Sequence, residues 1–202
     1  IVAALERAFR LAFAAVEPAG RRFLIGLDVS GSMGSGRVAG SPLSPREAAS
    51  AMALVLAATE PQTVTTAFTA GGASSWMPGN NPISQLPLRA SQTLDDVLAM
   101  TRSLPFGATD CALPMRYAAE RGLEVDCFVV LTDSETWAGD VHPVKALQAY
   151  RKQSGIDARL VVIGMVSNGF SIADPADRGM LDVVGFDTAT PALVSAFARG
   201  EL

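Results

Sequence analysis

The chain has 202 residues, of which 49% are hydrophobic and 18% are charged, and this balance indicates a globular protein with a large core rather than a disordered chain. A formal net charge of −4 argues against a broadly basic surface that binds nucleic acid by neutralising its phosphates. The two cysteines, Cys111 and Cys127, are too few for a disulfide scaffold, so a reducing, cytoplasmic setting is expected.

The first residues predict neither a membrane anchor nor a secretion signal. Glu6 and Arg10 interrupt the apolar run that a signal peptide needs. The longest strongly apolar helix-like stretch, Ala48–Thr59, is shorter than the about 20 residues that cross a bilayer, so no membrane partner is expected. Because the chain begins with Ile1 and not with Met, we expect it to be a piece of a longer protein.

Hydrophobic spacing divides the chain into a leading segment and one domain. Residues 1–16 carry apolar side chains at close to helical spacing, which predicts an amphipathic helix, and Glu17-Pro18-Ala19-Gly20 ends it. Residues 1–20 are therefore expected to form a leading helix or connector. Residues 21–202 show no internal repeat and no linker, so they are predicted to form a single domain.

Within that domain, strand-like and helix-like segments alternate. Strands are predicted at Phe23–Val29, Gln62–Thr69, Val125–Thr132, Ala158–Val166 and Met180–Val184, with a short edge strand at Ser75–Met77. Helices are predicted at Pro45–Thr59, Thr93–Ser103, Leu113–Arg121, Pro143–Gln153 and Pro191–Arg199. This alternation predicts an α/β fold: a doubly wound, mostly parallel, Rossmann-like sheet with one short antiparallel edge strand and helices on both faces.

Oxygen-bearing side chains gather where the first predicted strand ends. Asp28, Ser30 and Ser32 are spaced two apart, and alternate residues of an extended chain share a face. One carboxylate and two hydroxyls at the carboxyl end of a strand suit a hard cation such as Mg²⁺. The alternative is that the two serines only cap a helix and shape a turn.

Two further loops favour the metal interpretation. Thr109 lies in the loop Gly107-Ala108-Thr109-Asp110, and Asp133 directly follows a predicted strand. In the predicted sheet both loops open on the same edge as Asp28. The predicted ligands of one octahedral cation are Asp28, Ser30, Ser32, Thr109 and Asp133. Because only the two aspartates are charged, the cation would stay electrophilic and would accept an acidic ligand from outside.

These three loops resemble the metal-ion-dependent adhesion site of a von Willebrand factor A domain. The resemblance rests on Asp28-Val29-Ser30-Gly31-Ser32, Gly107-Ala108-Thr109-Asp110 and Thr132-Asp133, and it covers residues 21–202. It implies a Mg²⁺- or Mn²⁺-dependent site that binds an acidic side chain of a protein partner. It also implies a binding domain and not an enzyme.

Longer runs are similar to the carboxyl-terminal A domain of the Ro autoantigen family. Examples are the run from Thr132 to Gly139, Val141-His142-Pro143, and the run from Ser167 to Asp182. In that family a ring of helical repeats binds small non-coding Y RNAs, and the A domain closes the ring. The resemblance implies a role in non-coding RNA quality control. The implied partners are the ring of the parent protein, a Y RNA bound mainly by that ring and, through the RNA, an exoribonuclease.

Two loop aromatics are candidates for an exposed partner contact. Trp137 directly follows the metal loop at Asp133, and Phe170 lies in another loop beside likely ligand positions. Simple packing is the alternative for both. The paired basic residues Arg21-Arg22 and Arg151-Lys152 offer at most a supplementary RNA contact, because two pairs are more often a solvated face than a binding stripe.

Enzymatic alternatives leave weaker signals. The run from Gly31 to Val38 imitates a phosphate-binding loop but has Arg37 and Val38 where lysine and a hydroxyl are needed. A serine hydrolase could combine Ser30 or Ser32 with Asp133 and the single histidine, His142, although no Gly-x-Ser-x-Gly elbow is present. His142 precedes Pro143, so a role at a helix start is the expected one. Asp174 and Asp177 are expected to shape a turn rather than to bind a second metal.

Overall fold

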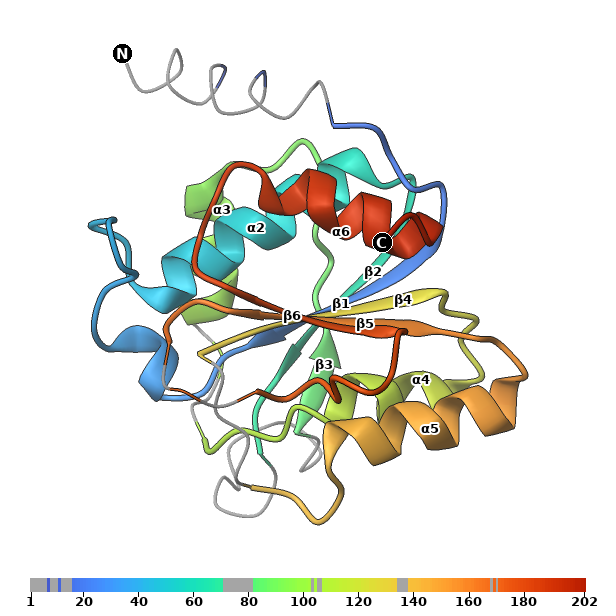
Figure 1. Cartoon of the computed structure of the whole chain (residues 1–202). Coiled ribbons are helices and arrows are strands. Elements are labelled where there is room, and N and C mark those ends of the chain that lie inside the picture. The colour runs from blue at the N-terminus through green and yellow to red at the C-terminus, as the bar shows by residue number, and fades with distance from the viewer. Residues whose placement is uncertain are drawn as a thin grey trace.

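The computed structural model describes residues 7, 11, 16–70, 82–102, 104, 107–133, 138–167, 169 and 171–202. In this part of the chain a six-stranded sheet lies between two layers of helices (Figure 1). The strands are β1 (Arg22–Asp28), β2 (Gln62–Phe68), β3 (Ile83–Gln85), β4 (Cys127–Thr132), β5 (Arg159–Gly164) and β6 (Met180–Val184). The helices are the 3₁₀ turn η1 (Ser32–Gly34), α2 (Pro45–Thr59), α3 (Leu94–Arg102), α4 (Leu113–Arg121), α5 (Pro143–Ser154) and α6 (Thr190–Arg199).

The strands follow the order β3-β2-β1-β4-β5-β6, and β3 alone among them pairs antiparallel. Helices α2, α3 and α6 cover one face of the sheet, and α4 and α5 cover the other (Figure 1). The predicted doubly wound fold is therefore confirmed. Consecutive crossovers run in opposite directions from β1, so β1 and β4 flank the switch point at which such sheets bind ligands.

The central strands are buried on both faces, which explains their continuous apolar sequences. Along β1, Phe23, Ile25 and Leu27 enter the core under α2 and α6, while Leu24 enters the core under α4 and α5. Gly26 also faces α4, where an added Cβ would lie 2.6 Å from Pro114 Cγ. Only a residue without a side chain lets α4 approach β1 this closely.

Local signals set the start of α2. The Ser44 side chain accepts a hydrogen bond from the Glu47 backbone, and the Glu47 carboxylate accepts one from the Ser44 N–H at 2.8 Å. This is the capping box that the sequence predicts. Most of the helix behind it is buried, as its nearly uniform apolar sequence indicates.

Two expectations fall outside the described residues. The edge strand predicted at Ser75–Met77 is one of them. The antiparallel edge strand that the structure describes is β3, directly after Pro82. The leading helix predicted over residues 1–16 is the other, since only Arg7, Leu11 and Val16 of this stretch are described.

The segment before β1 is attached to the domain by Glu60. Both oxygens of this buried carboxylate accept backbone N–H groups, from Ala19 at 2.8 Å and from Gly20 at 3.2 Å. Ser195 of α6 donates its hydroxyl to the same carboxylate at 2.8 Å. The chain therefore enters β1 through contacts with the end of α2 and with α6, two of the three helices of this layer.

Cys111 and Cys127 are buried free thiols, and burial raises the pKa of Cys127 well above its usual range. Within the described ranges, the helices are all too short or too polar to cross a membrane.

Candidate metal centre

The predicted ligands lie at the carboxyl edge of the central strands. Asp28 is the last residue of β1, and Asp133 follows the last residue of β4. The register pairs Leu27 with Leu131, so the two strands end side by side. Parallel pairing thus brings together two carboxylates that are far apart in the sequence.

Asp28 is the most enclosed member of the group, with no exposed surface. Its Oδ1 accepts the Ser30 backbone N–H at 2.8 Å, and its Oδ2 accepts the Thr132 hydroxyl at 2.7 Å. Burial raises the pKa of Asp28 to about 7, and the nearby charge of Asp133 acts in the same direction. A carboxylate so costly to ionise gains most from a cation beside it.

The two serine hydroxyls lie next to each other. Ser30 Oγ and Ser32 Oγ are 3.2 Å apart, with Ser30 buried and Ser32 exposed. The 3₁₀ turn η1 begins after Gly31 and has no side-chain cap. The Ser30 backbone N–H donates to Asp28, and the Ser30 side chain also hydrogen-bonds to that carboxylate.

Backbone contacts fix the loop that carries Thr109. The Gly31 N–H donates to Gly107 O at 3.3 Å and joins this loop to the first one. The Ala70 N–H and the Thr69 hydroxyl both donate to Ala108 O, at 2.5 and 2.9 Å. The end of β2 therefore holds the buried Thr109 beside the first loop.

The segment that begins at Ala138 also contacts the loop that carries Thr109. The Ala138 N–H donates to Thr109 O at 3.1 Å. Gly139 has a positive φ of 94°, and a Cβ there would lie 2.4 Å from Asp110 Oδ2. Burial raises the pKa of Asp110, whose Oδ1 accepts the Ala112 N–H at 3.0 Å.

The geometry suits a hard cation. The structure brings the three loops to one edge and supplies carboxylate and hydroxyl oxygens, which Mg²⁺ and Mn²⁺ prefer. Among the described residues no three His, Cys, Asp or Glu side chains gather at a point, so the hydroxyls would have to supply much of the donor set. The predicted contact residues Trp137 and Phe170 lie outside the described residues.

Two residues of the site have roles that the sequence did not reveal. Thr132 donates to Asp28, but a polar side chain in a strand buried on both faces gives no sign of its partner. Arg46 is buried, with its Nη2 3.2 Å from Ser30 O. Arg46 follows Ser44 and Pro45 at a helix start, where charged side chains are usually exposed to water, so its burial could not be expected from the sequence.

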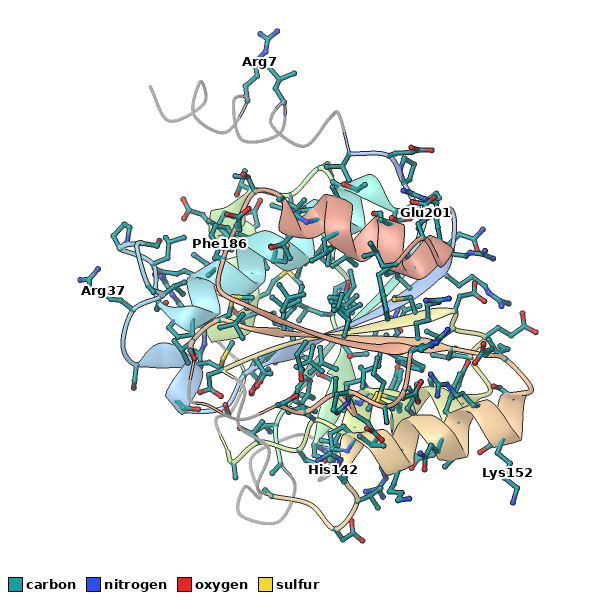
Figure 2. All side chains as sticks on the ribbon, in the orientation of Figure 1. Arg7, Arg37, His142, Lys152, Phe186 and Glu201 are labelled. Carbon is teal, nitrogen blue, oxygen red and sulfur yellow. The ribbon has the colours of Figure 1, made fainter. Side chains whose placement is uncertain are left out.

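Other predicted groups have structural roles. His142 Nδ1 accepts the Val144 N–H at 3.3 Å and caps α5, as expected from its place before Pro143 (Figure 2). Asp174 Oδ1 accepts the Ala176 N–H at 2.9 Å, and Asp177 Oδ1 accepts the Gly179 N–H at 2.8 Å, which confirms their turn-forming role.

The paired basic residues are partly neutralised. Arg22 pairs with Glu124 and with Asp126, and Arg151 Nη1 lies 2.5 Å from Asp177 Oδ2. Lys152 points into solvent beside Arg151 (Figure 2). Neither pair therefore offers two free cations to a phosphate backbone.

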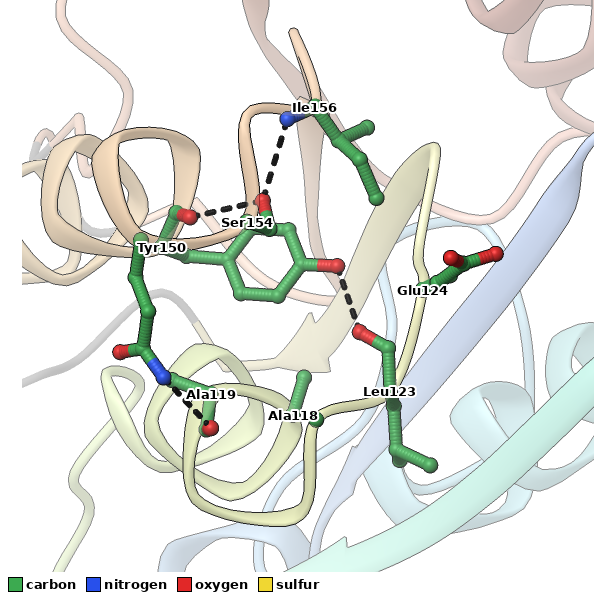
Figure 3. A pocket seen from close by; sticks show the side chains of 9 residues that line it. Ala118, Ala119, Leu123, Glu124, Tyr150, Ser154 and Ile156 are labelled. Carbon is green, nitrogen blue, oxygen red and sulfur yellow. Dashed lines mark hydrogen bonds between the residues drawn. The ribbon is translucent and has the colours of Figure 1, made fainter.

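A pocket of about 200 Å³ lies at the opposite edge of the sheet, between the carboxyl ends of α4 and α5 (Figure 3). Its lining is mostly small and apolar, and the Tyr150 hydroxyl inside it donates to Leu123 O at 2.7 Å. Glu124 is the one carboxylate of this lining. The pocket is separate from the loops that carry the predicted metal ligands.

Comparison with solved structures first defines the class of fold. A structure described as von Willebrand factor type A from Catenulispora acidiphila aligns over 89% of this chain and 42% of its own, with a TM-score of 0.52 at 16% identity. The described sheet is thus that of a von Willebrand factor A domain.

A family model described as the Ro60 vWA domain matches residues 22–198, and the chain belongs to this family. RNA-binding protein RO60 of Deinococcus radiodurans is 49% identical over all of this chain and 36% of its own length. The Caenorhabditis elegans protein of the same name is 42% identical over 98% of this chain and 29% of its own. The crystal structure of the Deinococcus radiodurans RO (RSR) protein aligns over the whole chain and 38% of its own, with a TM-score of 0.86 and 48% identity. The chain thus spans about a third of the length of these relatives.

Proposed function

We propose that this domain docks an acidic group of a protein partner through a Mg²⁺ or Mn²⁺ ion held by Asp28, Ser30, Ser32, Thr109 and Asp133. The observation that carries the proposal is the buried Asp28 carboxylate, hydrogen-bonded to Thr132 beside two adjacent serine hydroxyls. The ion would supply a Lewis-acidic position for the carboxylate of the partner. The residues of the chain would hold the ion and leave that position open.

Substitution of Asp28 tests the metal site. A ligand that binds only the folded state raises the melting temperature, so Mg²⁺ or Mn²⁺ should raise that of the wild-type chain. Asp28→Asn keeps the size of the side chain but removes its charge, and it should abolish the shift while the protein stays folded. Differential scanning fluorimetry in EDTA and in 5 to 10 mM Mg²⁺, about the range for a weak site, measures both effects.

Asp140→Asn is the matched control for this experiment. Asp140 lies in the loop near the site, but its side chain is 87% exposed and pairs only loosely with Arg116 at 3.4 Å. This variant should keep the full metal shift. A shift of equal size in Asp28→Asn would contradict the assignment.

The relatives suggest the setting of this docking domain. They are named RNA-binding proteins and are about three times as long as this chain. We propose that the chain is the A domain of a cytoplasmic Ro-type protein whose helical-repeat ring binds Y RNA and takes part in RNA quality control, with an exoribonuclease recruited through that RNA. Direct RNA contact by this domain would be supplementary, because Arg22 and Arg151 are already ion-paired.

We also propose that the domain is not an enzyme. The hydrolase alternative needs His142 as a base, and the Nδ1 of this exposed residue caps α5. Loss of an esterase or nuclease activity of the pure domain in both Asp28→Asn and His142→Ala would favour that alternative instead.

A further inference from the structure

Arg46 lies directly behind the loop that carries the predicted metal ligands. It is the second residue of α2, and only 7% of it is exposed. Its Nη2 donates to Ser30 O at 3.2 Å and approaches Val29 O at 3.5 Å. Both carbonyls belong to the stretch between Asp28 and Ser32, so the guanidinium supports the backbone that presents these ligands.

The guanidinium also adds a positive charge to the site. Burial lowers the pKa of Arg46, and the nearby carboxylate of Asp28 acts against this by favouring the charged form. Arginine nevertheless stays protonated in proteins. The positive charge of Arg102, at the end of α3, also lowers the pKa of Arg46, but Arg102 is exposed and water screens its charge. Among the described residues, Asp28 and Asp133 are the charged members of the predicted ligand set, and with both ionised they sum with Arg46 to one net negative charge.

We propose that Arg46 is a positioning residue whose charge makes cation binding depend on an anionic ligand. The inference rests on the proposed metal-docking function. A divalent cation would leave the site with one net positive charge, and a single carboxylate from a partner would cancel it. With a neutral residue at position 46 the cation alone would balance the two aspartates. The ligand would then bring an uncompensated negative charge into a buried site.

The test uses Mn²⁺ as the metal probe and acetate as the carboxylate probe. Electron paramagnetic resonance counts the free Mn²⁺ in titrations of the wild-type chain and of Arg46→Gln. Glutamine can still donate a hydrogen bond to a carbonyl but carries no charge. We expect Arg46→Gln to bind Mn²⁺ about tenfold more tightly, since a nearby positive charge repels the cation. Acetate should strengthen Mn²⁺ binding in the wild type and not in the variant.

Thermal stability gives a second readout that separates charge from scaffolding. In EDTA the melting temperature of Arg46→Gln should fall, because Asp28 loses a compensating charge, whereas the rise produced by Mn²⁺ should grow. A purely structural role would lower both quantities. Should Arg46→Gln not fold, Arg46→Met removes the same charge with a side chain that packs well, and the same comparison applies.

Two variants serve as controls. Arg46→Lys keeps the charge and should bind Mn²⁺ like the wild type. Arg37→Gln removes the same charge from an exposed side chain that points away from the body of the protein (Figure 2), and it should leave Mn²⁺ affinity unchanged.

Unchanged or weaker Mn²⁺ binding in a folded neutral variant overturns the role of Arg46. A wild-type chain that binds no more Mn²⁺ than Asp28→Asn overturns the proposed metal function itself, and the two failures are thereby distinguished.

Discussion

At the scale of single residues, the centre depends on how one buried carboxylate is held. Asp28 has no contact with solvent, so each of its hydrogen bonds replaces water that the folded protein excludes. Ser30, in the same loop, supplies a backbone N–H, and Thr132 on the neighbouring strand supplies its hydroxyl. The Thr132 hydroxyl therefore adds a side-chain link between the ends of β1 and β4 to their backbone pairing.

Thr132→Val tests this coupling. Valine has nearly the shape of threonine but cannot donate, so Asp28 Oδ2 loses its donor. We expect the metal-free protein to lose about 1 to 3 kcal/mol of unfolding free energy, the usual cost of leaving a buried polar group unpaired. Urea unfolding in EDTA measures the loss. Thr132→Ser keeps the hydroxyl and should retain more of the stability, and an equal loss in both variants would show that the methyl group matters instead.

How much of the site the sequence predicts depends on how local each signal is. Asp28, Ser30 and Ser32 are close in sequence and follow an apolar strand, so the sequence places them at one edge. The extended spacing expected across all three is not found, because β1 ends at Asp28 and Ser32 lies in the turn η1. Thr109 and Asp133 could be added because strand ends meet at that edge in a parallel sheet. Arg46 was not predictable, since only the tertiary packing of α2 against the first loop decides that its charge turns inward.

At the scale of secondary-structure elements, the central strands were predictable because both faces of a parallel sheet are covered. Continuous apolar runs then mark β1, β4 and β5, and capping residues mark the start of α2. The edge strands were harder to predict from the sequence. β3 has three residues and follows Pro82, and such short edge strands carry too little apolar pattern to be located from sequence.

The approach of α4 to β1 depends on the missing side chain of Gly26. A Cβ at this position would lie 2.6 Å from Pro114 Cγ and 3.3 Å from Phe68 Cε1. Gly26→Ala should therefore destabilise the protein by about 1 to 3 kcal/mol, as overpacked core substitutions do. Chemical denaturation compares this variant with the wild type.

Gly31→Ala is the matched control for this substitution. Gly31 has a φ of −62°, which any residue adopts, and a Cβ there meets nothing within 4 Å. Its effect on stability should be within about 0.5 kcal/mol. If Gly26→Ala were as harmless as Gly31→Ala, the helix would be free to shift away from the strand, and the packing argument would fail.

At the scale of the whole molecule, the carboxyl and amino edges of the sheet carry different kinds of interactions. The carboxyl edge holds the polar loops of the candidate site. At the opposite edge, ion pairs tie strand starts to their neighbours: Arg22 with Asp126, and Arg151 with Asp177. The second pair connects α5 to the turn before β6, so it stabilises the last strand without touching the loops of the candidate site.

The Arg151–Asp177 pair makes global stability depend on pH in acid. The hydrogen bond from the Arg151 guanidinium is the main cause that lowers the pKa of Asp177, and burial opposes it. A depressed folded-state pKa contributes stability above the unfolded value of about 4 and loses it as the pH falls through the folded pKa. The difference in unfolding free energy between the wild type and Asp177→Asn should thus be constant from neutral pH down to about pH 5 and shrink below about pH 4.

Asp157→Asn gives the control on the same arginine. The Asp157 carboxylate lies 3.8 Å from Arg151 Nε, but its side chain is fully exposed, whereas that of Asp177 is 22% exposed. Water screens the exposed partner, so Asp157→Asn should follow the wild-type curve of stability against pH. Guanidinium unfolding at several pH values between 3 and 7, about the window set by the carboxylate pKa, gives all three curves. A difference for Asp177→Asn that persists unchanged at the acid end would contradict a role through charge, since asparagine still accepts the Gly179 N–H.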